Sequence, residues 1–391
     1  MSGTLKVTTL QDGASSTANM TFDSSGNATV GNNLTVTGTA AMASSFKRNR
    51  IINGNMLIDQ RNAGASASSA NSTYYLDRYQ TVVNPNSKFT IQQNAGSVTP
   101  PAGFSAYLGI TSSSAYTVAA GEYQTLWQRI EGYNVADLNW GSASAKTVTL
   151  SFWAYSSLTG TFGGAIQNSA VNRSYPFSYS IPTANTWTYI TVTIPGDTTG
   201  TWLTTNGVGL TLSFGLGVGS TFSGTAGAWA ASNLLSATGA VSVVGTSGAT
   251  FYITGVQLEV GTKATPYEMQ IYSDQLAQCQ RYYYQGFFLA GIWGGTAIQA
   301  LLSTPVPMRT TPTTGITGTG YLQMGDTVNA GVTQSVAGWG ITSPAAQNLS
   351  ANYQTFQWAA GNFAGLTAYR MYYQSDYSGG TNNLATLSAE L

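Results

Sequence analysis

The side chains in this sequence best suited to chemistry are aromatic rings interleaved with Asn, Gln, Ser and Thr. A flat ring can pack on the C–H face of a sugar, and neutral amides and hydroxyls can hydrogen-bond its hydroxyl groups. The strongest cluster of this kind lies near the C-terminus. We predict a glycan-binding surface formed by these residues: Trp339, Tyr353, Trp358, Tyr369, Tyr372, Tyr373 and Tyr377.

Burial is the competing interpretation, because aromatic residues in β-proteins are buried more often than they bind a ligand. In the run "AYRMYYQSDY", strand alternation puts Tyr369 and Tyr373 on one face and Tyr372 on the other, and one of these faces is expected to be core. Four tryptophans also have two interpretations. They could line a cleft of the central domain, or they could pack in a sandwich or trimer contact. These residues are Trp127, Trp140, Trp153 and Trp187.

The sequence has few residues that could support catalysis. The sequence has no histidine, which excludes a Ser-His-Asp triad, a Cys-His pair and an imidazole metal ligand. Cys279 is the single cysteine, so an intrachain disulfide, a cysteine zinc cluster and a CxxC redox motif are excluded as well. We expect Cys279 to be a buried, inert thiol, and we expect no enzyme activity, no cofactor and no metal site.

A polysaccharide-degrading enzyme would need two carboxyl groups roughly 5 to 9.5 Å apart. The chain has only fourteen acidic residues, and they are scattered. Glu122 and Glu131 lie nine residues apart and could face each other across a hairpin. A salt bridge or capping role through Arg129 is the competing interpretation.

Charge is scarce throughout the chain. Charged residues make up 7% of the sequence, and the formal net charge is zero. Such a composition is typical of a durable, surface-exposed β-protein, and it argues against nucleic acid as a partner. The tightest basic cluster, Lys47, Arg48 and Arg50, is interpreted as a solvated joint between domains. We also expect no signal peptide and no membrane insertion, which suits a protein assembled in the cytoplasm and released later.

The pattern of strands and turns predicts an all-β protein in three parts. Residues 1–44 form a short segment of Thr/Val alternations that is too small to make a core alone, so it must pair with copies of itself or dock on another protein. Residues 45–270 form a jelly-roll sandwich. Residues 271–391 form a smaller β-domain with a short leading helix, in which long Gly/Thr-rich segments such as "RTTPTTGITGTG" are expected to be surface loops.

Period-two alternation is clearest in four runs. In residues 147–157, the positions of Val148, Leu150, Phe152 and Ala154 share one face, and those of Thr149, Ser151, Trp153 and Tyr155 share the other. The further runs are 186–195, 208–219 and 249–261.

The leading helix is expected to be capped by Ser273 and to present Leu276, Cys279 and Tyr283 on one face. Tyr282, Tyr283 and Tyr284 are interpreted as packing at the domain joint rather than as a stacking ladder.

Several stretches, taken in order, resemble bacteriophage tail fibres or receptor-binding proteins that carry a jelly-roll domain like a carbohydrate-binding module. "NRIINGNMLIDQRNAG" with "YYLDRY" resembles the opening of that domain, and "FYITGVQLEVGTKATPYE" is similar to its closing strand. "QCQRYYYQ" followed by "PVPMRTTPT" resembles the start of the C-terminal domain, while "VGNNLTVTGTA" and the ending "LATLSAEL" are similar to other fibre segments.

The resemblance implies a homotrimer whose N-terminal segment docks on a tail adaptor, tube or baseplate protein of the virion, while the fibre binds host surface polysaccharide. It also implies that the opening and closing segments lie side by side as first and last strands. Leu57, Phe152, Tyr252, Val256 and Leu258 would then be core.

Four acidic residues of the resembling motifs have two interpretations. Similar jelly rolls sometimes hold a calcium ion with such acids and backbone carbonyls. Bonds to Arg61, Arg78 or loop amides are the alternative that we favour. The four residues are Asp59, Asp77, Glu259 and Glu268.

The sequence thus favours a non-catalytic receptor-binding fibre of a phage tail. A structural capsid or neck fibre that binds no receptor is the first alternative, and a polysaccharide-degrading tailspike is a weaker one.

Overall fold

The computed structural model divides into two compact units, residues 1–46 and 47–391. The structure describes residues 9–10, 20–22, 28–30, 47–286, 289–294, 297–316, 322–326, 333–336, 355–360, 371–375 and 385–391. Within these ranges no helix has the length and apolar character needed to cross a membrane.

The first unit contains three short strands, β1 (Thr9–Leu10), β2 (Met20–Phe22) and β3 (Ala28–Val30). They form an antiparallel sheet in chain order, in which Leu10 pairs with Met20 and Met20 pairs with Val30. Three of the short strands predicted in residues 1–44 are therefore present, and the run "NLTVTGT" lies outside the described residues.

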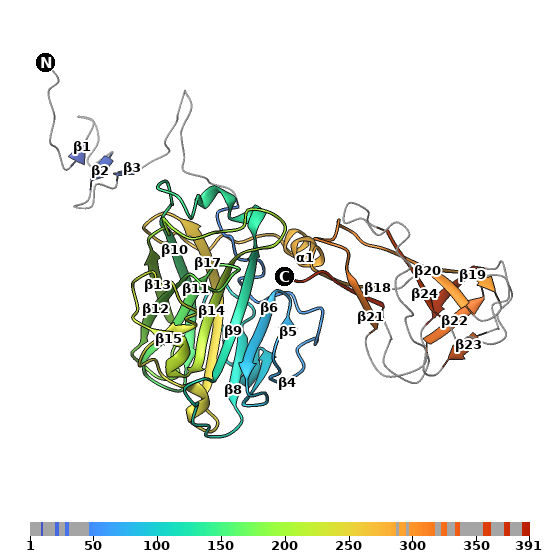
Figure 1. Ribbon diagram of the computed structural model, residues 1–391, viewed down its shortest axis with the longest axis horizontal. Helices are drawn as coiled ribbons and strands as arrows, with labels where there is room; N and C mark the ends of the chain where they lie inside the picture. The colour runs from blue at the N-terminus through green and yellow to red at the C-terminus, as the bar shows by residue number, and fades with distance from the viewer. Residues whose placement is uncertain are drawn as a thin grey trace, which may run out of the picture. The chain divides into compact units, whose positions relative to one another are not determined.

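The second unit is dominated by two six-stranded antiparallel sheets (Figure 1). Sheet I has the order β13-β10-β17-β8-β7-β4, and sheet II has the order β12-β11-β14-β9-β6-β5. The strands of sheet I are β4 (Ala67–Ser68), β7 (Phe89–Gln93), β8 (Leu108–Ser112), β10 (Val148–Ser156), β13 (Thr188–Ile194) and β17 (Thr250–Val260). The strands of sheet II are β5 (Thr73–Leu76), β6 (Tyr79–Asn84), β9 (Tyr123–Glu131), β11 (Gly160–Gln167), β12 (Ser174–Ile181) and β14 (Val208–Val218).

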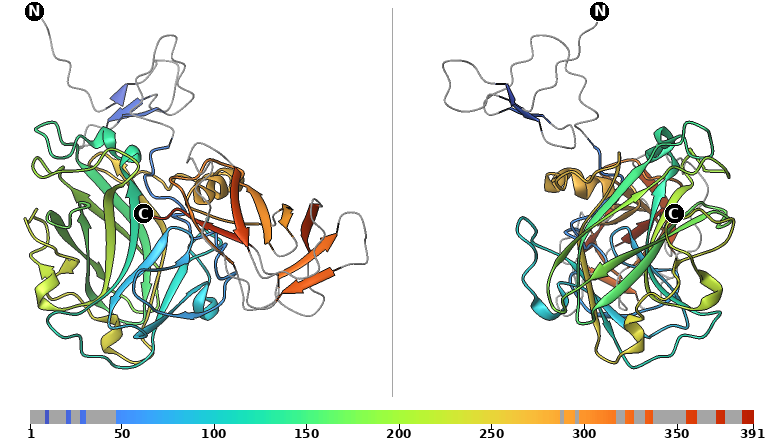
Figure 2. Two further views of the ribbon diagram at one scale, coloured as in Figure 1. Left: turned by 45° about the vertical axis from the view of Figure 1, so that its right-hand side comes forward. Right: turned by 90° about the vertical axis from the view of Figure 1, so that its left-hand side faces the viewer.

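The two sheets pack face to face as a β-sandwich, and Figure 2 gives two further views of these layers. Val148, Leu150, Phe152 and Ala154 on β10 are all fully buried, as the alternation predicts. The ring of Phe152 lies 5.1 Å from that of Phe214 on β14, in the opposite sheet. Alternation of this kind fixes one face of each strand in the core because neighbouring side chains point to opposite sides.

Short elements connect these strands. The pair β15 (Ser223–Gly224) and β16 (Ser236–Ala237) is parallel. The 3-10 turns are η1 (Ala95–Ser97), η2 (Gly132–Asn134), η3 (Ala136–Leu138), η4 (Ser220–Phe222) and η5 (Val243–Gly245).

The first strand predicted from the opening segment of the sandwich is absent, although the segment lies beside β17, as expected. Residues 47–58 contain no strand, yet they run beside β17: the amide of Arg50 donates to the Leu258 carbonyl at 2.9 Å, and the amide of Val256 donates to Gly54 at 2.9 Å. Met56 has a φ of 59°, and this turn conformation breaks the alternation.

The same turn overturns one predicted core residue. Leu57 is only half-buried, while its neighbours Met56 and Ile58 are buried. The other predicted core residues, Phe152, Tyr252, Val256 and Leu258, are buried.

Helix α1 (Tyr272–Gln280) begins one residue before the expected cap. Ile271 occupies the N-cap position without a side-chain hydrogen bond, so the expected role of Ser273 is wrong. The helix buries Cys279, as predicted, together with Gln275 rather than Leu276. It ends before Tyr283, which belongs to the next strand, β18 (Tyr283–Gly286).

The remaining strands form two further antiparallel sheets. One has the order β18-β26-β21, with β21 at Thr313–Ile316 and β26 at Ala385–Ser388. The other has the order β23-β22-β25-β19-β20-β24. Its strands are β19 (Leu289–Gly294), β20 (Ala297–Ser303), β22 (Leu322–Asp326), β23 (Thr333–Val336), β24 (Thr355–Ala360) and β25 (Met371–Ser375).

Strand β21 corrects the prediction of a loop throughout "RTTPTTGITGTG". Thr313 to Ile316 pair along β26, from Thr313 opposite Ser388 to Ile316 opposite Ala385. Threonine is well suited to a strand once a partner is available, and the sequence alone does not show that the end of the chain supplies one.

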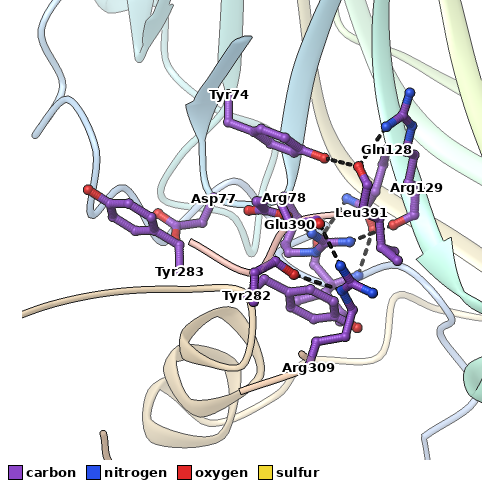
Figure 3. Close-up of polar contacts among 12 residues, drawn as sticks. Tyr74, Asp77, Arg78, Gln128, Arg129, Tyr282, Tyr283, Arg309, Glu390 and Leu391 are labelled. Carbon is purple, nitrogen blue, oxygen red and sulfur yellow. Dashed lines mark hydrogen bonds and ion pairs between the residues drawn. The ribbon is translucent and has the colours of Figure 1, made fainter. Parts of the chain in front are cut away.

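An arginine-rich joint holds the end of the chain against the sandwich (Figure 3). Glu390 forms ion pairs with Arg61, at 2.7 Å, and with Arg78. Arg129 donates to the Leu391 carbonyl at 2.6 Å, and Arg309 donates to the carbonyls of Ala389 and Glu390. The guanidinium of Arg78 also lies 3.6 Å from the centre of the Tyr282 ring.

Tyrosines 282 and 283 pack at this joint, as predicted. The Tyr282 hydroxyl donates to Glu131 at 2.7 Å, and Arg281 pairs with the same carboxylate at 2.7 Å. Tyr283 lies beneath Arg61, with the guanidinium 3.8 Å from the ring centre. Several of the chain's few charged residues therefore join the C-terminal strands to the sandwich.

Candidate functional site

The outward face of sheet I carries a band of aromatic side chains. On β10, Trp153 pairs across the sheet with Tyr189 of β13, and Tyr155 pairs with Tyr252 of β17. These positions alternate with the buried core residues of β10, so the register itself places their rings on the face away from the core.

A groove of about 470 Å³ opens at one end of this band. One wall is the pair Trp153 and Tyr189, whose ring centres lie 5.2 Å apart. The other wall is the pair Phe104 and Tyr267, also 5.2 Å apart, in an edge-to-face arrangement. The remaining lining residues are Ala102, Ser151, Gly255, Ala264, Thr265, Pro266 and Met269.

The floor of the groove depends on Gly255. Its φ of +63° is a conformation that favours glycine, and the pairing of β10 with β17 shifts register next to it, between Ser151 and Trp153. A Cβ atom at this position would lie 2.7 Å from Phe104 Cζ and 3.2 Å from Trp153 Cδ1. Glycine therefore lets both aromatic walls approach the same point.

We expect Gly255→Ala to lower the unfolding free energy by about 2 kcal/mol, from the left-handed backbone and the steric contact together. It should also weaken ligand binding about tenfold, because the walls must separate. Gly248→Ala is the matched control: its φ is +70°, but a Cβ there meets nothing within 4 Å. Thermal unfolding and affinity should be measured for both, and equal effects of the two substitutions on affinity would contradict the role of Gly255.

The groove walls are accessible and uncharged. Tyr189 is 43% exposed and Met269 is 53% exposed, while Trp153, Phe104 and Tyr267 are partly buried. Burial raises the pKa of the Tyr267 phenol, which therefore stays neutral. The lining contains no Asp, Glu, Lys or Arg. Flat rings around neutral hydroxyls suit the apolar faces and hydroxyl groups of a sugar.

A second aromatic pair lies one rung along β10. Trp187, just before β13, lies 5.4 Å from Tyr155, and Tyr155 stacks on Tyr252 at 5.2 Å. Trp187 and Tyr155 remain partly exposed, and the indole N–H of Trp187 donates to the Thr99 carbonyl at 2.9 Å.

The predicted C-terminal site residues are placed only in part. Trp339, Tyr353, Tyr369 and Tyr377 lie outside the described residues. Trp358 lies on β24 and Tyr372 and Tyr373 lie on β25.

Strand pairing connects two of these positions. Trp358 pairs with Ala300, Ala300 with Ala290, and Ala290 with Tyr372, so the four positions form one row across the sheet. Trp358 and Tyr372 therefore occupy one row of paired positions, and Tyr373 lies one residue further along β25, where it pairs with Leu289. Their part in ligand binding stays a prediction.

Glu122 and Glu131 do not face each other. Glu122 precedes β9 and Glu131 is its last residue, so about 27 Å of extended strand separates them. Glu131 pairs with Arg281 rather than with Arg129. The backbone amide of Ala119 and the hydroxyl of Tyr116 donate to Glu122 and lower the pKa of its carboxyl. The spacing rules out a shared catalytic role.

The acids of the resembling motifs are bonded to amides and hydroxyls. Asp59 accepts from the backbone amides of Asn62 and Gly64, at 2.9 and 2.7 Å. Asp77 accepts from Gln60, Glu259 from Thr265, and Glu268 from the Asn49 amide. The favoured bonding to amides is confirmed, whereas Arg61 and Arg78 form their ion pairs with Glu390 and not with these acids. In the part of the chain that the structure describes, no group of three or more acidic or cysteine residues could hold a metal ion.

The sequence points to Trp153 and Trp187 as possible cleft residues and misses Tyr189, Phe104, Tyr267 and Met269. The signal for Trp153 is the alternation of β10, which sets Trp153 and Tyr155 opposite the core residues, whereas Trp187 lies just before β13. Phe104, Tyr267 and Met269 lie in loops, and only folding brings these loops to the same face of sheet I.

No family model matches the sequence, and comparison with curated proteins gives no match. Among solved structures, a putative sugar binding protein from Bacteroides thetaiotaomicron is 14% identical, with a TM-score of 0.32 over 55% of this chain and 100% of that chain. A family 11 carbohydrate-binding module from Clostridium thermocellum, in complex with a mixed-linked tetrasaccharide, is 10% identical, with a TM-score of 0.26 over 52% of this chain and 100% of that chain. The enzymatically active domain of tailspike protein 4 from bacteriophage CBA120 is 14% identical, with a TM-score of 0.29 over 55% of this chain and 22% of that chain.

Proposed function

We propose that this protein binds a glycan, without catalysis, through the groove on sheet I. The observation that carries the proposal is the pair of aromatic walls around Gly255, with no ionisable carboxyl, amine or guanidinium in the lining. Such a surface offers stacking and neutral hydrogen bonding. It lacks the carboxyl pair that glycoside hydrolysis ordinarily requires.

We further propose that the glycan belongs to a bacterial surface and that the chain is a receptor-binding fibre of a phage tail. The scarcity of charge and the resemblance of several sequence stretches to tail fibres support this. In that role the N-terminal segment attaches to a tail adaptor, tube or baseplate protein, and the fibre assembles as a homotrimer in the host cytoplasm. The aromatic positions on β24 and β25 then provide a second surface for host polysaccharide.

The test uses the full-length protein, fluorescently labelled, on bacterial cells with untreated or periodate-oxidised surface polysaccharide. We expect saturable binding that periodate removes, together with at least a tenfold loss of affinity in Tyr189→Ala. Because Tyr189 is 43% exposed, its removal should leave folding intact. The matched control is Tyr272→Ala, at a 58% exposed tyrosine that lines neither this groove nor another described cleft.

Three outcomes are informative. Binding that survives periodate overturns the glycan assignment. Binding lost equally in both tyrosine variants overturns the groove as its site. Release of reducing sugar from the polysaccharide overturns the non-catalytic assignment.

We expect glycan affinity to stay constant between about pH 5 and pH 9. The groove has no carboxyl, amine or imidazole group, and burial raises the pKa of the Tyr267 phenol, so its proton is retained even further into alkali than usual. Titration of the immobilised polysaccharide across this range measures the effect. A sigmoidal change in affinity centred inside the range would show that an ionising group contacts the ligand.

A further inference from the structure

We infer that the ligand is an uncharged, linear glycan of at least two sugar residues, which runs along β10 from the groove to the Trp187 and Tyr155 pair. This inference rests on the proposed function and specifies its ligand class. It follows from the arrangement of the aromatic pairs and from the charges around them.

The two partly exposed aromatic pairs repeat along one strand. Trp153 with Tyr189 forms the first pair, and Tyr155 with Trp187 forms the second. Trp153 and Tyr155 are two residues apart on β10, so their Cα atoms are separated by about 7 Å. A ligand that contacts both pairs must extend along the strand, which a single sugar ring cannot do.

The surroundings of the groove favour a ligand without charge. No cation lines the groove to compensate a carboxylate or sulfate group, so an acidic sugar would lose hydration without gaining an ion pair. The charged residues adjacent in sequence to the lining are Lys263 and Glu268, and neither belongs to the lining itself. The Glu268 carboxylate is engaged by the Asn49 amide at 2.9 Å.

The chain also has a cleft that is lined by cationic side chains. A second cleft of about 290 Å³ is lined by Lys47, Arg50 and Arg281 together with Tyr133. Arg50 and Arg281 are already paired with Asp137 and Glu131. This cleft provides an internal comparison, because an acidic glycan would be expected there rather than at sheet I.

The experiment starts from a surface polysaccharide that retains the wild-type protein. Mild acid hydrolysis fragments it, and the fragments are separated by size and, on an anion exchanger, by charge. Each pool then competes with the intact polysaccharide for the full-length protein. We expect neutral fragments of two or more residues to compete, with affinity rising with length, while monosaccharides and acidic fragments do not.

Two variants test the second aromatic pair. Trp187→Ala should lower the affinity for long neutral fragments about tenfold and leave the affinity for the shortest binding fragments unchanged. Tyr155→Leu, which keeps apolar bulk and loses the flat ring, should act in the same direction even if Trp187→Ala folds poorly. Tyr272→Ala, at an exposed tyrosine outside both clefts, is the control.

The outcomes separate the two levels of inference. If no polysaccharide retains the protein, the proposed function fails. If retention occurs but monosaccharides compete as well as longer fragments, or both variants bind long fragments normally, the extended ligand is overturned. If acidic fragments compete best, or affinity falls steeply between about 0.05 and 0.5 M salt, the uncharged ligand is overturned.

Discussion

Trp153→Ala lowers the affinity for surface polysaccharide by about 30-fold to 150-fold and abolishes stable retention on cells. This is the largest functional effect we expect of a single substitution. Trp153 is a wall of the groove, contacts the point where Gly255 has no side chain, and borders the second aromatic pair on the same strand. Removing a central aromatic contact of this kind ordinarily costs about 2 to 3 kcal/mol of binding free energy.

The measurement is a direct titration of the full-length variant against the polysaccharide that retains the wild type. Trp153→Phe keeps a flat ring of smaller area and should recover part of the affinity. Trp153 lies on the outward face, so its removal should affect thermal unfolding much less than a core substitution such as Phe152→Ala. Normal affinity in a correctly folded Trp153→Ala protein would move the binding site away from sheet I.

The sequence was sufficient to predict four strands of the sandwich, β10, β13, β14 and β17, because alternation reports which face of a strand is buried. Val148 to Ala154 illustrate this, since every second residue is in the core. The conformation of residues 49–58 was not predictable in the same way. Asn53 and Met56 adopt positive φ angles there, and neither residue type demands such a turn.

The sequence prediction puts the binding residues in the C-terminal domain, and of the groove on sheet I it weighs only Trp153, with packing as the simpler interpretation. Trp153 was recognisable because its strand alternates, whereas Phe104 and Tyr267 reach the groove from loops that are far apart in the sequence. The special role of Gly255 also depends on a register shift between β10 and β17, which no local pattern records. The local sequence pattern therefore indicates the type of each element and which of its faces is buried, but it does not indicate which loops come together in the fold.

The second large effect concerns stability. Glu390→Ala should lower the free energy of unfolding by about 3 to 5 kcal/mol, since it removes the carboxylate that pairs with Arg61 and Arg78. The side chain of Arg78 is only 1% exposed. It would keep its bond to the Arg129 carbonyl and its contact with the Tyr282 ring, but its charge would remain buried without an anion.

Urea unfolding of the full-length protein measures this effect, and the chain offers a matched control. Asp137→Ala removes the ion pair with Arg50, in which the Arg50 side chain is 21% exposed and the Asp137 side chain is 47% exposed. It should lower the free energy of unfolding by less than about 1 kcal/mol. In a double-mutant cycle, Arg78→Met combined with Glu390→Ala should cost clearly less than the sum of the single changes, because neither charge is then left alone. Strict additivity would show that the pair does not couple the end of the chain to the sandwich. Strong coupling would instead mean that these buried charges anchor β26, the central strand of its sheet, to the sandwich. A chain with so few charged residues would then retain some of them for this joint.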